Sequence, residues 1–152
     1  MTIWRELATL DDAEAIRRIR NDGRAWFRDG DAITEEEQRA WLESVLARSG
    51  RDFICYVVGD PIVGYGMLQR RDGRLWISLA VDLSRRGQGI GSEIYKGLAR
   101  FADEEVFAAI RVENIPSRRA AERAGYVSRS EVAPPDGALP EEWIVMSKAG
   151  AP

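Results

Sequence analysis

Histidine is absent from the 152-residue sequence, and cysteine occurs only once, at Cys55. Without histidine, catalysis by a serine–histidine or cysteine–histidine pair is excluded. The same scarcity leaves too few soft ligands for a zinc site, and a lone cysteine cannot form an internal disulfide. We therefore expect no metal and no disulfide framework in this protein.

Long hydrophobic runs are also missing. The longest uninterrupted one is Phe53–Val58, far short of the roughly 18 residues that indicate a membrane span. The N-terminal residues show no apolar signal-peptide core, so we expect a cytoplasmic protein without a membrane partner. Because 22 basic and 25 acidic side chains give a net charge of −3, we expect no nucleic-acid partner either. The length is typical of a single domain, 1–152.

Two helices are predicted in the first third of the chain. Asp11 with Glu14 favours a helix start, and apolar residues then recur at helical spacing to about Asn21. Thr34 and Glu37 form a capping box for the second helix. Its predicted buried stripe consists of Trp41, Leu42, Val45 and Leu46. The intervening residues 22–33 have the composition of a loop that carries aromatic side chains.

Strand periodicity begins near residue 53. Segments 53–58, 62–68 and 75–81 are separated by turn signals, so they are expected to pair antiparallel. A helix over 90–102 and a strand over 106–112 then predict a right-handed parallel crossover. A short helix containing Pro116 is expected to end at Gly125, followed by strands within 126–131 and 142–147. These patterns indicate an α/β fold with one mixed sheet.

A glycine-rich loop concentrates the chemistry of the sequence. Gly87, Gly89 and Gly91 lie between a strand and a helix start, where glycine lets the backbone approach a ligand closely. Free N–H groups of the first helical turn, with the positive end of the helix dipole, favour an anion. Arg85 and Arg86 add positive charge beside them. A phosphate or diphosphate is the natural ligand, although a tight strand-to-helix turn with exposed arginines also explains the pattern.

Two known phosphate-binding motifs differ from this loop, one in the residues that follow the glycines and one in the glycine spacing. The P-loop is excluded because no Gly-Lys-Ser/Thr follows the glycines. A dinucleotide site stays open as an alternative, since Glu113 lies at a suitable distance to accept a ribose hydroxyl. The glycine spacing here is GxGxG, however, whereas the dinucleotide fingerprint is GxGxxG within the first crossover unit.

Read with its flanks, the loop resembles the GNAT superfamily of N-acetyltransferases. The residues that carry this resemblance are LAVDLSRRGQGIGS at 79–92, NIPS at 114–117 and AGY at 124–126. Arg86, Gly89 and Gly91 occupy the RxxGxG acyl-CoA signature of that family. The resemblance covers nearly the whole chain and implies the GNAT fold, including a first short strand at 2–7 and two splayed central strands.

The resemblance implies that acetyl-CoA, as co-substrate, lies where strands 75–81 and 106–112 diverge. The pantetheine would follow the backbone of Leu79 and Val81, while the amides of 87–92 would surround the diphosphate. The amide near Leu79 would polarise the acetyl carbonyl. The implied cofactor-binding set is Leu79, Ala80, Val81, Arg86, Gly87, Gln88, Gly89, Ile90, Gly91, Ser92, Asn114 and Ser117.

The expected catalytic groups depart from the commoner family pattern. Many members carry a tyrosine where this chain has Ala121, so the NxxS branch, Asn114 to Ser117, is the better match. The resemblance then assigns the Ser117 hydroxyl to the leaving thiolate, although a serine there can also cap the helix. Glu113 is a candidate base, although a charged residue at this place is more often a surface partner, here of Arg111 or Arg118. Further candidate bases are Asp82, Glu131, Asp136 and a water chain.

The resemblance also implies that acceptor specificity comes from the segment between the first two helices, here residues 24–31. Trp26 and Phe27 are positioned to stack on a sugar or base, or else to cover the core, while arginines contact phosphate. The predicted substrate-binding residues are Arg24, Trp26, Phe27, Arg28, Tyr65 and Trp76. A likeness to amino-sugar nucleotide N-acetyltransferases points to a small-molecule amine. A protein N-terminal amine, an amine antibiotic, a non-catalytic acyl-CoA sensor and a homodimer stay open.

Overall fold

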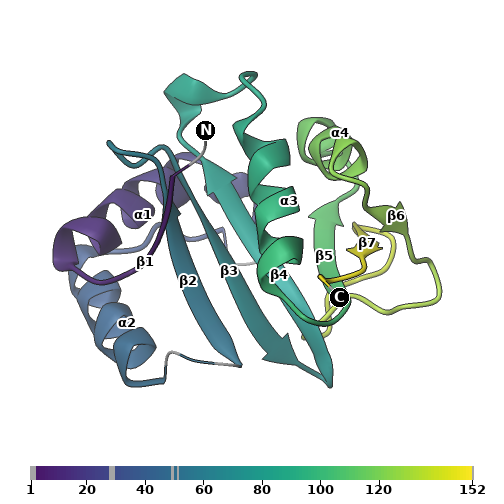
Figure 1. Ribbon diagram of the computed structural model, residues 1–152, viewed down its shortest axis with the longest axis horizontal. Coiled ribbons are helices and arrows are strands. Elements are labelled where there is room, and N and C mark those ends of the chain that lie inside the picture. The colour runs from purple at the N-terminus through teal and green to yellow at the C-terminus, as the bar shows by residue number, and fades with distance from the viewer. Residues whose placement is uncertain (1–2, 28–29, 49, 51, 152) are drawn as a thin grey trace.

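The computed structural model describes residues 3–27, 30–48, 50 and 52–151. Within them, a seven-stranded sheet has the order β1-β2-β3-β4-β5-β7-β6. Every neighbouring pair is antiparallel except β4 and β5, which are parallel (Figure 1). The predicted mixed α/β fold is confirmed. The strands are β1 (Trp4–Glu6), β2 (Phe53–Val58), β3 (Gly64–Arg71), β4 (Arg74–Val81), β5 (Val106–Arg111), β6 (Val127–Ser128) and β7 (Trp143–Lys148).

Two pairs of helices cover the two faces of the sheet. Along β3, Tyr65 packs with the core beneath α1 and α2, whereas its neighbour Gly66 faces Leu98 of α3. Because consecutive strand residues point to opposite faces, α1 and α2 lie on one face and α3 on the other. Figure 1 shows α3 and α4 side by side in front of the sheet. The helices are α1 (Leu10–Asp22), α2 (Glu35–Arg48), α3 (Ile90–Phe101) and α4 (Ile115–Arg123).

The start of α1 differs from the sequence prediction. Thr9 is its N-cap, and the Thr9 hydroxyl accepts the Asp12 N–H at 3.1 Å. In return the Asp12 carboxylate accepts the Thr9 N–H at 3.2 Å. The predicted start at Asp11 and Glu14 is therefore wrong, and Glu14 instead pairs with Arg17. Thr9 caps the helix in place of Asp11 because its hydroxyl, on an extended backbone, reaches the N–H of the third helical residue.

The capping box of α2 is confirmed by reciprocal bonds between Thr34 and Glu37, of 2.9 and 3.1 Å. Leu46 was expected in the buried stripe of this helix but is 48% exposed, so the stripe is narrower than predicted. The strand expected over 126–131 contains only Val127–Ser128. It ends early because Val132 turns back to donate its N–H to the Arg129 carbonyl oxygen.

The two parallel strands separate along their length. β4 and β5 are in register only at Leu75↔Val106, Trp76↔Phe107 and Ile77↔Ala108. Beyond these pairs β4 stays paired with β3 as far as Val81, and β5 stays paired with β7 as far as Arg111. The predicted divergence of the central strands is thus confirmed, and each strand is held in place by its other neighbour.

Candidate active site

The glycine loop joins the end of β4 to the start of α3. Gly87 and Gly89 have φ angles of 80° and 81°, a left-handed conformation that strongly favours glycine. A Cβ atom at either position would meet no atom of the described residues within 4 Å. The loop is exposed, and Gly89 is the N-cap of α3 without a side-chain hydrogen bond. The first turn of α3 is therefore open toward an anion from outside the chain.

The two arginines of this loop take different directions. Arg85 donates from Nε to the Gln88 side-chain oxygen at 3.2 Å and remains exposed. The Arg86 guanidinium reaches the end of α1, because a Cβ on Gly23 would lie 3.0 Å from its nitrogen. A cation is favourable at that place, where the carboxyl end of α1 carries partial negative charge.

Ser117 lies in the first turn of α4, where its hydroxyl is 2.6 Å from the Tyr95 hydroxyl. The capping function belongs to Asn114, whose side-chain oxygen accepts the Ser117 N–H at 3.4 Å. Burial raises the pKa of Tyr95 to about 12, so this phenol stays protonated at neutral pH. The Tyr126 hydroxyl donates to the Tyr95 main-chain oxygen at 2.8 Å and fixes this part of α3.

Tyr95 is the group that sequence reasoning missed at this site. It lies on α3, 22 positions before Ser117, and only the packing of α3 against α4 brings the two hydroxyls together. The sole signal in the sequence was a tyrosine among the apolar residues of a predicted amphipathic helix. Such a residue is more often part of the core than of a site.

Three of the alternative bases are engaged in ion pairs. Asp82 accepts Arg18 at 2.7 Å and the Ser84 N–H at 3.0 Å, and these bonds lower its pKa to about 2. Glu131 pairs with Arg129, which lowers the pKa of this carboxyl, and Asp136 pairs with Arg71. The lowered pKa makes Asp82 and Glu131 poor proton acceptors at neutral pH.

Glu113 is exposed between β5 and α4. The two arginines expected to pair with it bond elsewhere. Arg118 donates to the Val112 carbonyl oxygen at 3.1 Å, and Arg111 donates to the Phe27 carbonyl oxygen at 3.4 Å. Glu113 therefore remains a solvent-facing carboxylate at the carboxyl end of β5.

The predicted acceptor residues are distributed over the face of the sheet that α1 and α2 cover. Trp26 is 36% exposed, whereas Phe27 is partly buried against the core beneath α1 and α2. Of these two aromatic residues, Phe27 is therefore the one that covers the core. Arg24 is exposed in the short 3-10 helix Arg24–Trp26, and Arg28 lies outside the described residues. Trp76 is buried apart from them, in a cluster with Phe107 whose ring centroid is 5.6 Å away.

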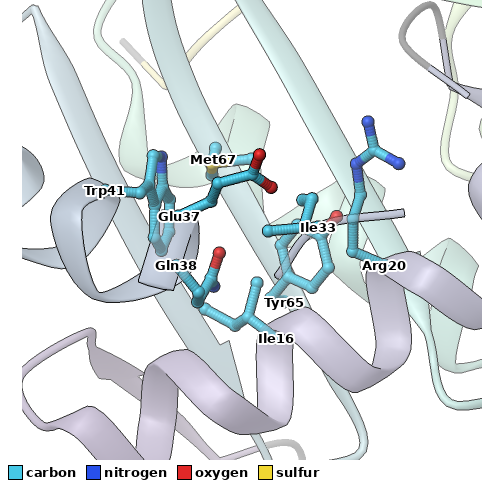
Figure 2. Close-up of a pocket in the computed structure, with 8 residues that line it drawn as sticks. All are labelled: Ile16, Arg20, Ile33, Glu37, Gln38, Trp41, Tyr65 and Met67. Carbon is cyan, nitrogen blue, oxygen red and sulfur yellow. The ribbon is translucent and has the colours of Figure 1, made fainter. Parts of the chain in front are cut away.

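A cavity of about 260 Å³ opens between α1, α2 and β3, on the same face. Figure 2 shows Trp41 at one end of it and Arg20 at the other, with Tyr65 between them. Among the predicted acceptor residues that the structure describes, Tyr65 alone lines this cavity. The remaining lining residues were not predicted because they come from α1, α2, β3 and the loop before α2. The lining residues are Ile16, Arg20, Ile33, Glu37, Gln38, Trp41, Tyr65 and Met67.

These features define a class of protein: a mixed sheet with two diverging parallel strands, beside a glycine loop at a helix start. The family described as acetyltransferase (GNAT) domain matches residues 3–127. The chain therefore belongs to the GNAT acetyltransferase family. No curated protein matches the chain. No helix among the described residues is long and apolar enough to cross a membrane.

Solved structures share the fold at low sequence identity. One is yncA, an acetyltransferase from Salmonella typhimurium with acetyl-CoA, at 20% identity and a TM-score of 0.75, covering 100% of this chain and 98% of that one. Another is ribosomal-protein-alanine N-acetyltransferase from Brucella melitensis, with 22% sequence identity and a TM-score of 0.76. The match covers 97% of this chain and 99% of that one. A third is spermidine N-acetyltransferase from Vibrio cholerae in complex with CoA and spermine, with 13% sequence identity and a TM-score of 0.78. The match covers 97% of this chain and 95% of that one.

Proposed function

We propose that this protein is an acetyl-CoA-dependent N-acetyltransferase that acts, as one domain, on a primary amine of a small molecule. The observation that carries the proposal is the divergence of β4 and β5 directly before the open glycine loop. An extended pantetheine can pair with the free edge of β4, while the loop amides receive the diphosphate. Family membership of residues 3–127 supports the same assignment.

The backbone of β4 supplies the stabilising group for the acyl transfer. Attack of an amine on a thioester passes through a tetrahedral oxyanion, and a fixed N–H donor stabilises the charge that develops only then. Leu79 lies on the part of β4 that has separated from β5, so its amide is the proposed donor. No protein nucleophile is needed in this scheme.

Ser117 and Tyr95 serve the leaving group in the proposed mechanism. The thiolate of CoA needs a hydrogen-bond donor, and this chain has alanine at position 121. The Ser117 hydroxyl donates toward the sulfur while Tyr95, protonated because it is buried, donates to Ser117. The acceptor ammonium loses its proton to Glu113 directly or through water, since Glu113 is exposed at the end of β5.

An amino-sugar nucleotide is the proposed acceptor class to test first, in keeping with the NxxS pattern at 114–117. Two of the named neighbours are described as acetyltransferases of other amines, a ribosomal-protein alanine and spermidine. The test measures thiol release from acetyl-CoA over a panel of amino-sugar nucleotides, amine antibiotics, N-terminal peptides and polyamines. Turnover with a small amine supports the proposal. Binding of acetyl-CoA without turnover on any amine contradicts it and indicates an acyl-CoA sensor.

A further inference from the structure

One row of residues crosses the sheet at the level of the proposed oxyanion donor. Tyr65 on β3 is paired with Ala80 on β4, the residue after Leu79. The register Trp76↔Phe107 and Ile77↔Ala108, continued along both strands, brings Arg111 of β5 to the level of Ala80. Strand alternation places Tyr65, Ala80 and Arg111 on the α1 and α2 face. Arg111 therefore lies across the diverging strands from Tyr65.

Arg111 is a partly buried cation without an acidic partner among the described residues. Its Nε atom is buried and makes no hydrogen bond there, while a terminal nitrogen makes a long 3.4 Å bond to the Phe27 carbonyl oxygen. The guanidinium packs over the Trp143 ring, 4.6 Å from its centroid. Burying part of a guanidinium without a hydrogen-bond partner is unfavourable, so an anion bound here would satisfy a donor that the described residues leave without one.

A second guanidinium approaches Phe27 from α1. The Arg20 guanidinium carbon lies 3.9 Å from the Phe27 ring centroid, and Arg20 lines the cavity. Its charge also acts on the Tyr65 hydroxyl, which is completely buried and makes no hydrogen bond among the described residues. Arg20 has further contacts of its own, but a guanidinium has five N–H donors and can bind a ligand in addition.

The opposite wall of the cavity has acceptor groups. The Gln38 amide donates its N–H to the Ala13 carbonyl oxygen at 2.7 Å, which leaves its own oxygen turned toward the cavity (Figure 2). Glu37 lines the same wall and accepts the Thr34 N–H through one carboxylate oxygen. The guanidinium groups of Arg111 and Arg20 beside Phe27 match an anionic group, and the acceptor oxygens on α2 match hydrogen-bond donors of the same ligand.

We propose that the acceptor is an amine that also carries an anionic oxygen group, a carboxylate or a phosphate, and that Arg111 and Arg20 bind this group beside Phe27. The Tyr65 hydroxyl donates to the same anion. The inference rests on the proposed acetyltransferase function and deepens it, because it defines which amines are substrates. The proposed anion ligands are thus Arg111 and Arg20, which the sequence pattern did not indicate, and not the exposed Arg24.

The test compares matched acceptors with acetyl-CoA: an L-amino acid against its amide, and an amino-sugar phosphate against the free amino sugar. The wild-type protein should prefer the anionic member of one pair at least tenfold in kcat/KM. Arg111→Gln and Arg20→Gln should each reduce that preference at least tenfold through the acceptor KM, while the acetyl-CoA KM stays within about twofold. Arg111→Lys should restore part of it, since the charge remains but the fork geometry does not.

Arg74→Gln is the matched control. The Arg74 guanidinium also lies over an aromatic ring on this sheet, at 5.5 Å from the Phe107 centroid, but at the opposite end of β4. It should leave the preference unchanged. If the protein prefers the L-amino acid over its amide, the anionic group of the acceptor is a carboxylate. If it prefers the amino-sugar phosphate over the free amino sugar, the group is a phosphate. Equal rates within both pairs, or an unchanged preference in Arg111→Gln, overturn the inference while the acetyltransferase function stands. Absence of turnover with every amine overturns the proposed function itself.

Discussion

The hydroxyl groups of Ser117 and Tyr95 lie 2.6 Å apart, across the contact between α4 and α3. This pair joins a residue at a helix start, positioned by the Asn114 cap, to a buried phenol whose main-chain oxygen is held by Tyr126. The half-buried Ser117 hydroxyl is thus held against the Tyr95 hydroxyl, as the proposed leaving-group role requires.

Ser117→Ala should lower kcat about 10- to 100-fold, because the thiolate then leaves without its hydrogen-bond donor. The dissociation constant of CoA should change by less than about threefold. Steady-state kinetics and isothermal titration with CoA measure the two quantities. An unchanged kcat would remove Ser117 from the mechanism.

Tyr95→Phe should also lower kcat, by about tenfold, since the Ser117 hydroxyl loses the donor behind it. Tyr126→Phe is the matched control: it removes a hydroxyl from the same cluster but not one that contacts Ser117. That control should cost about 1 kcal/mol in the free energy of unfolding and leave kcat near the wild-type value. Equal losses of kcat in both variants would show a purely structural effect.

Gly89→Asp should weaken CoA binding more than tenfold, because a carboxylate would face the diphosphate and a side chain is strained at φ 81°. Gly73→Asp provides the control. Gly73 has φ 76° and equally open space around a Cβ, but lies in the turn between β3 and β4. Both variants should be destabilised similarly in thermal melts, and only Gly89→Asp should lose the CoA-dependent shift. Retained affinity in Gly89→Asp would refute the loop assignment.

The buried Asp12 carboxylate predicts a pH-dependent stability. Hydrogen bonds from Arg5, Ala8 and Thr9 lower its pKa to about 2, below the value of about 4 in an unfolded chain. The stabilisation is therefore fully present above about pH 4 and is lost as the pH falls toward 2. It amounts to at most about 2 kcal/mol, since Arg5 is half exposed.

Urea unfolding of the wild-type protein and of Asp12→Asn at several pH values tests this prediction. The variant should be less stable at pH 7, and the difference should shrink as the pH approaches 2. A difference that stays constant over this range would assign the effect to packing instead.

Gly97→Ala should destabilise the fold by about 1–3 kcal/mol, because the added Cβ would lie 2.2 Å from the Trp4 ring. Gly91→Ala in the same helix meets only ordinary contacts of 3.7 and 3.8 Å, so it should be neutral or slightly stabilising. Chemical denaturation of the two variants measures the difference. Equal stabilities would show that Trp4 does not pack against α3 as described.

The sequence predicted those features whose signal is local. The Thr34 and Glu37 box, the left-handed Gly125 and the run of strands from Phe53 all depend on neighbours within a few positions. The diverging strands followed from the family resemblance, and the register confirms them. Thr9 was missed as a cap because two acidic residues just after it gave a competing start signal.

The side-chain partners within the site could not be predicted in the same way. Tyr95 meets Ser117 only because α3 packs against α4. Arg20 meets Phe27 because the chain that follows α1 brings the Phe27 ring back over the guanidinium. Arg111 looked like a surface residue because a charged side chain at a strand end usually is one. That its Nε has no hydrogen-bond partner among the described residues becomes visible only when those residues are placed.

Amide hydrogen exchange with and without acetyl-CoA tests the central claim most directly. Acetyl-CoA should slow exchange in two separate segments at once, residues 78–82 at the free edge of β4 and residues 87–92 in the glycine loop, whereas NAD should slow neither. Protection by NAD, or unchanged exchange of 78–82 at saturating acetyl-CoA, would contradict the account.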